Sequence, residues 1–203
     1  YPKDVDDLKK LVKFVIEKRS QQNSKFDIHN SLSLTARAAG SDMSGGPLNE
    51  SIIVNFTKYF THLNMFDANS VAVEPGKYYR DFEKEMLRYG LIFPSYPASK
   101  SICAMGGIVN NNSGGEKTLK YGKTEDFVEG LKMVLSDGDE YTFHALDKSG
   151  LKAKMKQKDF EGDIYRKMYK LITKNYKLIT AAKPNVTKNS AGYMLWNVYD
   201  KEG

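Results

Sequence analysis

The sequence is poor in the residues that build covalent and metal-based frameworks. Its 203 residues include one cysteine, Cys103, so no disulfide can form within the chain and no site can combine several cysteine ligands. No apolar run approaches the roughly 20 residues that a membrane-spanning helix needs. A chain of this length can still bury a sizeable core without such staples. These absences favour an ordinary globular protein, and we expect it in the cytoplasm.

Reactive side chains are also scarce. The three histidines, His29, His62 and His144, are far apart in the sequence, and none has the spacing of a metal-ligand pair, so we expect no metal site. No set of serine, histidine and aspartate is suggested by spacing. Cys103 lacks a partner motif, which favours a small buried residue over a nucleophile.

The basic excess is confined to one end of the chain. The formal net charge is +6, but residues 146–203 alone hold 13 basic and 6 acidic residues. The lysines of 151–158 lack interleaved aromatic rings, and this pattern predicts a solvated basic segment. A phosphate-binding patch, or a peripheral position at a membrane surface, is the alternative. We expect no nucleic-acid partner.

Apolar periodicity predicts a mixture of helices and strands. Residues 4–20 read as an amphipathic helix, because their apolar residues repeat at helical spacing. Strands are predicted at 31–37, 51–56 and 71–74, a helix at 78–88 ending at Gly90, a hairpin from 127–135 and 140–144, and a helix within 163–180. The glycine-rich segments between these elements are predicted as loops.

Glycines gather in two places that need an explanation. Three of the 16 lie between positions 40 and 46, and seven lie between 106 and 138. One explanation is turn formation, and the other is a close approach of backbone N–H groups to an anion, as in phosphate-binding loops. Neither segment matches G-x-x-x-x-G-K-[ST] or a G-x-G-x-x-G that follows a first strand, which excludes P-loop and Rossmann nucleotide sites.

Taken in order, these segments resemble one family. Residues 37–46 (RAAGSDMSGG) resemble the R-G-G-G-T-S-L-S-G-G pyrophosphate loop of the FAD-binding domain of the vanillyl-alcohol-oxidase, or p-cresol-methylhydroxylase, type. Its V-x-P-G … x-G-L segment is matched by residues 73–76 together with 89–91. Its flavin loop is matched by residues 97–122, and its V-L-x-D-G hairpin by residues 135–138. The resemblance covers about residues 1–145. Residues 184–193 more loosely resemble the D-lactate dehydrogenase and glycolate oxidase branch.

The resemblance implies FAD as the cofactor, with contacts from the first loop, from Pro75 and from the second loop. The first loop would hold the pyrophosphate through Ala38, Ala39, Gly40, Ser41, Asp42, Met43, Ser44 and Gly45. The remaining contacts would come from Pro75, Pro97, Ala98, Ser99, Met105, Gly106, Gly107, Val109, Asn112, Ser113, Gly115, Tyr121 and Gly122. In the second loop, the expected contributions are small groups and hydrogen-bond donors.

Two positions depart from the family pattern. Members that hold their flavin covalently often carry a histidine in the first loop, where this chain has Ser41, so we expect FAD to be bound non-covalently. Asp42 places a carboxylate beside the expected phosphate site. Its side chain should therefore point away from the phosphates or bind elsewhere.

The implied fold is α+β with two FAD-binding subdomains. Residues 1–66 would form a small βαβ-like lobe, and 67–203 a mixed sheet with helices and a basic C-terminal extension. The implied activity is that of a flavin-dependent oxidoreductase that oxidises a small D-2-hydroxy acid, of the lactate or glycolate type, by hydride transfer to flavin N5. The sequence identifies neither a catalytic residue nor an electron acceptor.

Two alternatives stay open at this point. An enolpyruvyl-sugar reductase of the same fold would share the glycine loops, whereas a cofactor-free basic binding module would act through the lysines of 146–203. Both ends of the chain resemble those of a trimmed domain or of one piece of a split protein. We therefore expect a C-terminal substrate domain or a separate subunit as a partner, without which the chain would be inactive.

Overall fold

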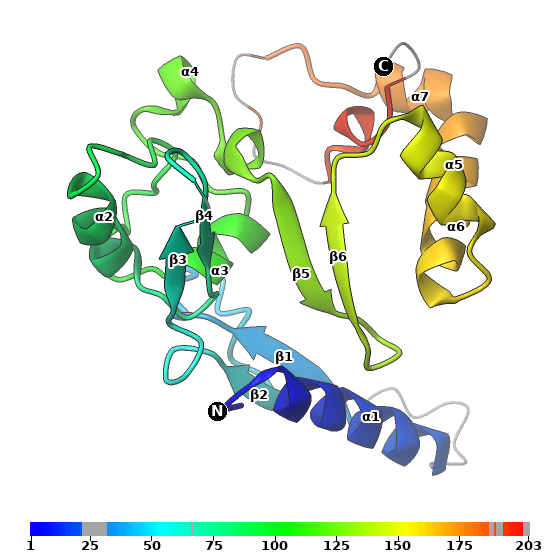
Figure 1. The fold of residues 1–203 in the computed structure, drawn as a ribbon, viewed down its shortest axis with the longest axis horizontal. Helices are drawn as coiled ribbons and strands as arrows, with labels where there is room; N and C mark the ends of the chain where they lie inside the picture. Colours follow the sequence, from blue (N-terminus) through cyan, green and yellow to red (C-terminus); the bar gives the residue numbers. More distant parts are fainter. Residues whose placement is uncertain (22–31, 66, 187–188, 190–192, 201–203) are drawn as a thin grey trace. The chain divides into compact units, whose positions relative to one another are not determined.

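The computed structural model describes residues 1–21, 32–65, 67–186, 189 and 193–200 (Figure 1). Within it the chain divides into two compact units. The first comprises Tyr1–Val128 and Met133–Glu140, and the second comprises Glu129–Lys132 and Tyr141–Gly203. The expected subdomain boundary at residue 66 falls inside the first unit, and it stays a prediction.

The first unit opens with a helix and a pair of parallel strands. Helix α1 (Val5–Gln21) carries acidic residues in its first turn and basic residues in its last, which complements the helix dipole. Strands β1 (Leu34–Arg37) and β2 (Ile52–Asn55) are parallel. The segment 38–51 connects them, so the first glycine cluster lies in the connection that returns the chain to the start of β2. The predicted helix and both strands are confirmed, although Ser31 lies outside the described residues.

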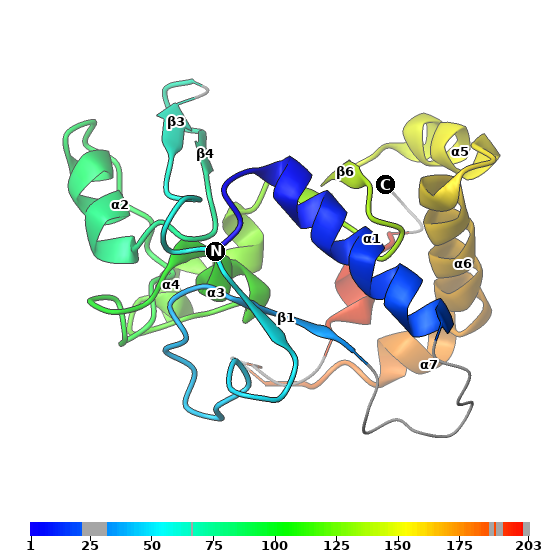
Figure 2. The same ribbon diagram turned by 90° about the horizontal axis from the view of Figure 1, so that it is seen from below.

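Helix α2 and an antiparallel strand pair form the next layer. Strands β3 (Leu63–Met65) and β4 (Val71–Val73) pair antiparallel, and α2 (Tyr79–Leu87) lies beside them in both views (Figures 1 and 2). Gly90 follows α2 with a φ of +71°, which confirms its predicted role in ending the helix. Strand β3 was not predicted.

The main core lies between α2 and the segments that follow it. Tyr79, Phe82 and Met86 recur at helical spacing on one face of α2 and are all buried. The cluster is completed by Tyr96, Cys103, Met105 and Ile108. The core thus ties α2 directly to the second glycine-rich segment.

The second glycine-rich segment contains short helices, which corrects the prediction of a continuous loop. It contains α3 (Met105–Asn110) and is followed by α4 (Thr118–Tyr121) and a 3₁₀ turn, η2 (Thr124–Phe127). Two adjacent glycines disfavour a helix. Met105 and Ile108, however, are three residues apart and both enter the core, so their burial offsets the low propensity of Gly106 and Gly107.

A hairpin whose residues are divided between the two units comes next, and the helices that follow it lie in the second unit. Strands β5 (Gly130–Val134) and β6 (Glu140–His144) form the predicted hairpin, with Gly138 at a φ of +81°. Helices α5 (Lys148–Lys156), α6 (Phe160–Lys174) and α7 (Tyr176–Ala181) follow, then a 3₁₀ turn η3 (Leu195–Asn197). The single helix predicted within 163–180 is therefore interrupted, at Asn175. None of the described helices is long and apolar enough to cross a bilayer.

The lysine-rich segment, for which no helix was predicted, folds mostly as α5, which has no buried residue. The carboxylates of Asp147 and Asp159 accept the N–H groups of Gly150 and Gly162, at 2.7 and 2.9 Å, and cap α5 and α6. Lys154 reaches Glu161 at 2.5 Å and joins the two helices, which lie side by side in both views (Figures 1 and 2).

Candidate functional site

The first glycine loop leaves β1 and turns sharply twice. Gly40 and Gly45 have φ values of +69° and +74°, a conformation that side chains rarely adopt. A Cβ atom at Gly45 would meet nothing within 4 Å, so this glycine borders open space. Left-handed residues of this kind occur in loops whose backbone N–H groups bind anions.

Asp42 acts as the internal anchor of this loop. Its carboxylate accepts the N–H of Ser44 at 3.1 Å, the hydroxyl of Ser44 at 2.6 Å, and the N–H of Gly46 at 3.0 Å. The hydrogen bonds from Ser44, followed by that from Gly46, lower the pKa of Asp42 below its ordinary value of 3.8. The Ser44 donors are thereby committed within the loop, and the expectation that this carboxylate points away from the phosphates stays a prediction.

The segment after β4 packs tightly against the start of α3. The N–H of Gly106 donates to the carbonyl of Pro75 at 2.9 Å, and the N–H of Met105 donates to that of Lys77 at 2.9 Å. A Cβ at Gly76 would lie 2.1 Å from the Phe56 carbonyl oxygen, and one at Gly106 would lie 2.6 Å from the Pro75 Cβ. The second and third predicted motifs therefore meet through backbone contacts that only glycine permits.

Helix α3 also faces the first loop. Among the described residues, an added Cβ atom on Gly107 would have one neighbour within 4 Å, the Cβ of Ala38 at 3.9 Å. The N–H of Gly107 already donates to the carbonyl of Ala104 at 3.1 Å. Gly106 and Gly107 thus contribute small size to this site, whereas the donors expected from them are used within the protein.

The predicted residues beyond α3 form a compact turn system. A Cβ on Gly115 would lie 2.1 Å from the Tyr96 carbonyl oxygen, next to Pro97. The hydroxyl of Ser95 donates to the carbonyl of Gly122 at 2.6 Å, and the Tyr96 hydroxyl donates to Glu116 at 2.8 Å. These contacts place residues 95–97 and 115–122 together.

The predicted contact residues all lie in the first unit, in four neighbouring places. Those of the first loop follow β1, and Pro75 follows β4. The 97–99 turn precedes α3, which contains Met105, Gly106, Gly107 and Val109, and the chain continues through Asn112, Ser113 and Gly115 to the end of α4 at Tyr121 and Gly122. Met105 is 5% exposed and Met43 fully exposed, so the side chain of Met105 serves the core. The assignment of these residues to the cofactor stays a prediction.

The surroundings of Cys103, His62 and His144 suit structural roles. Cys103 is buried in the core, and burial raises the pKa of its thiol, which makes it a poor nucleophile. Nδ1 of His62 lies 2.8 Å from Glu74, and His144 ends β6. His29 lies outside the described residues.

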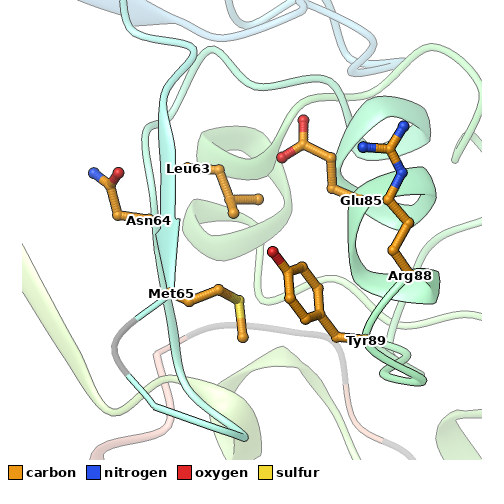
Figure 3. Close-up of a pocket in the computed structure, with 6 residues that line it drawn as sticks. All are labelled: Leu63, Asn64, Met65, Glu85, Arg88 and Tyr89. Carbon is orange, nitrogen blue, oxygen red and sulfur yellow. The ribbon is translucent and has the colours of Figure 1, made fainter.

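The described part of the chain also has a pocket away from the glycine loops. It has a volume of about 340 Å³ and lies between β3 and the end of α2 (Figure 3). Its lining residues are Leu63, Asn64, Met65, Glu85, Arg88 and Tyr89. None of the predicted contact residues lines it, and Glu85 is already paired with Lys77 at 2.5 Å. The glycine loops therefore stay the predicted cofactor site, because the family's motifs meet there through close packing.

Comparison with known families decides the class of this domain. Residues 1–144 match the family described as the FAD binding domain. The chain belongs to this family. Its FAD-binding domain includes both glycine-rich segments and the β5–β6 hairpin, which confirms the predicted family and FAD as the cofactor, and argues against a cofactor-free module.

Three curated relatives match parts or all of the chain. A D-2-hydroxyglutarate dehydrogenase of Pseudomonas putida is 24% identical over 100% of this chain and 20% of its own length. The glycolate oxidase subunit GlcD of Bacillus subtilis is 30% identical over 68% of this chain and 27% of its own. A D-lactate dehydrogenase of Archaeoglobus fulgidus is 32% identical over 62% of this chain and 30% of its own. The chain thus spans less than a third of each relative.

A solved structure supports the α+β fold. The 6-hydroxy-D-nicotine oxidase of Arthrobacter nicotinovorans superposes with a TM-score of 0.57 and 22% identity, over 70% of this chain and 28% of that one. The predicted α+β class and the resemblance to the D-lactate dehydrogenase and glycolate oxidase branch are both confirmed.

The residues present fit an FAD molecule at the glycine loops. The diphosphate is an anion, and a buried side-chain donor without a partner, Nε of Arg37, lies directly beneath Gly40. An added Cβ at Gly45 would meet nothing within 4 Å, and one at Gly107 would meet only the Cβ of Ala38, at 3.9 Å. Arg37 is the first residue of the loop motif, but it was not predicted as an FAD contact. The sequence did offer a signal for such a contact, because Arg37 is the one basic residue between positions 32 and 57.

Proposed function

We propose that this chain is the FAD-binding portion of a flavin-dependent oxidoreductase that oxidises a small D-2-hydroxy acid. The observation that carries the proposal is the convergence of the family's motifs on one site, with Pro75 and Ala38 both against the start of α3. The names of the relatives, which include D-2-hydroxyglutarate, glycolate and D-lactate enzymes, support the substrate class.

In this proposal the protein binds and orients while the cofactor supplies redox chemistry. Bound FAD would accept a hydride from the hydroxy acid at flavin N5. The first loop would hold the diphosphate over Gly40 and Gly45, whose positive φ values turn the backbone without strain. Helix α3 and residues 97–99 would limit the space available to the flavin and its ribityl chain. Groups that hold the substrate carboxylate and accept the hydroxyl proton would come from a further domain or subunit.

The decisive experiment is titration of the purified chain with FAD. Saturable binding with a flavin spectrum would support the proposal, and absence of binding would refute it. Bound FAD should then be mixed anaerobically with D-lactate, glycolate or D-2-hydroxyglutarate while its absorbance is followed. We expect no rapid bleaching from residues 1–203 alone, because proximity and proton transfer both require groups that we have not identified among the described residues. Rapid bleaching would show that the acid–base groups lie within this chain.

We further propose that the FAD is held non-covalently, because Ser41 stands where covalent members often carry a histidine. Acid precipitation of the loaded protein should release the yellow chromophore into the supernatant. Colour that stays in the pellet would contradict this mode of attachment.

A further inference from the structure

The side chain of Arg37 turns back beneath the first glycine loop. An ideal Cβ at Gly40 would lie 2.5 Å from Nε of Arg37, 2.9 Å from Nη2 and 3.0 Å from Cζ. The guanidinium therefore fills the space that a side chain at Gly40 would need. The positive φ of Gly40 favours glycine by itself, whereas the guanidinium is the end of a flexible side chain and can shift.

One donor of this guanidinium is buried without a partner. Nε of Arg37 is inaccessible and makes no hydrogen bond in the described structure. Leaving a buried donor unpaired costs free energy, more for a charged group than for a neutral one. The unpaired donor, next to Gly40 of the loop predicted to bind the diphosphate, leaves this guanidinium short of hydrogen-bond acceptors.

The charge balance of the loop points to the same ligand. Between positions 32 and 57 the sequence has one basic residue, Arg37, and two acidic residues, Asp42 and Glu50. Asp42 is ionised at neutral pH, because its hydrogen bonds from Ser44 and Gly46 lower its pKa. An FAD diphosphate would bring further negative charge to a loop that already carries a carboxylate. Backbone dipoles alone would have to offset this repulsion unless a cation takes part.

We propose that Arg37 binds the FAD diphosphate through its guanidinium and offsets the carboxylate of Asp42. Arginine suits this task because its planar group donates several hydrogen bonds to phosphate oxygens and keeps its charge when partly buried. This inference rests on the proposed FAD binding and goes beyond it by assigning the charged ligand of the diphosphate.

The test compares ligands with and without phosphates. FAD, ADP and riboflavin are titrated into the unmodified chain and into Arg37→Met and Arg37→Lys, with ADP and riboflavin measured by direct calorimetry. Arg88→Met is the matched control, since it removes the same charge from an exposed position at the end of α2. For Arg37→Met we expect about 10- to 100-fold weaker binding of FAD and ADP, the range given by losing a charge-assisted hydrogen bond. Riboflavin binding should not change, and Arg37→Lys should recover part of the loss.

Two further readouts separate ligand binding from loop support. The affinity for FAD should fall less steeply with salt in Arg37→Met than in the unmodified chain, because one charge contact is gone. The unfolding midpoint of the ligand-free variant should stay within about 2 °C of the unmodified one, a shift of less than about 1 kcal/mol for this size. Equal losses for riboflavin and ADP, or a large fall in the midpoint, would show that Arg37 only supports the loop and would overturn the inference.

The outcomes also distinguish this inference from the proposed function. If the unmodified chain binds no FAD, both are wrong. If it binds FAD and Arg37→Met binds FAD and ADP equally well, the domain is an FAD site whose diphosphate is held without Arg37.

Discussion

Replacement of Gly106 by alanine should destabilise the protein although alanine is the better helix former. Gly106 and Gly107 are neighbours in the first turn of α3, so the gain in helix propensity, up to about 1 kcal/mol, is similar at both positions. An added Cβ at Gly106 would lie 2.6 Å from the Cβ of Pro75 and 3.0 Å from its Cα. Carbon atoms normally approach to about 3.5–4.0 Å, so α3 or the Pro75 backbone must move. Gly107→Ala is the matched control, because its Cβ meets only Ala38, at 3.9 Å.

The difference between the two variants isolates the cost of this clash. Overpacking of this kind costs about 1–3 kcal/mol, while the propensity gain cancels in the comparison. At about 2–4 °C per kcal/mol for a chain of this size, Gly106→Ala should unfold about 2–12 °C below Gly107→Ala. Thermal unfolding of the ligand-free proteins, followed by circular dichroism, measures this. Equal midpoints would refute the argument that the contact with Pro75 demands a glycine. In addition, Gly107→Ala should fold well but bind FAD more weakly, since its Cβ enters the gap facing the first loop.

Three further perturbations test separate contacts. Gly40→Val should abolish FAD binding while circular dichroism stays largely unchanged, because a β-branched residue is strained at a φ of +69° and collides with the Arg37 guanidinium; unaltered affinity would mean that the loop is only a turn. The stability that the Asp42 hydrogen bonds give the ligand-free protein should be fully present above about pH 4 and be lost as pH falls through the lowered pKa of Asp42, so the unfolding midpoint should fall less steeply in acid in Asp42→Asn; identical acid limbs would contradict this. Glu161→Gln, in the second unit, should lower the free energy of unfolding in urea by up to about 3 kcal/mol, because Glu161 is nearly buried beside Lys154. Asp139→Asn, in the first unit, breaks an exposed pair and should lower it by less than about 1 kcal/mol. Similar losses in the two variants would refute the distinction by burial.

Local patterns predicted the elements that depend on local signals. The amphipathic spacing of α1, the strands on either side of the first loop and the glycine after α2 were all predicted correctly. Helix α3 was missed because two adjacent glycines argue against a helix, while the burial that favours it depends on tertiary contacts of Met105 and Ile108. Helix α5 was missed because alternating lysines hide its apolar spacing. Its N-cap at Asp147 was the available signal.

The glycine motifs show what sequence can and cannot resolve at the site. A glycine in a motif means that a Cβ atom is unwelcome, but three causes produce the same letter: a left-handed backbone, a neighbouring backbone, or a ligand. The structure separates them. Gly76, Gly106 and Gly115 are required by the protein, because their added Cβ atoms would lie within 2.6 Å of a carbonyl oxygen or of Pro75.

Gly45 and Gly107 differ, since an added Cβ there meets nothing within 4 Å, or only Ala38 at 3.9 Å. At Gly107, packing within the described structure does not demand a glycine. At Gly45, the positive φ favours a glycine, but packing against neighbouring atoms does not demand one. A glycine that internal packing does not demand is where a ligand has most to gain from the missing side chain. On these grounds the proposed FAD would come closest to the protein at Gly45 and Gly107, which lie in the first loop and in α3, two segments separated by some sixty residues in the sequence.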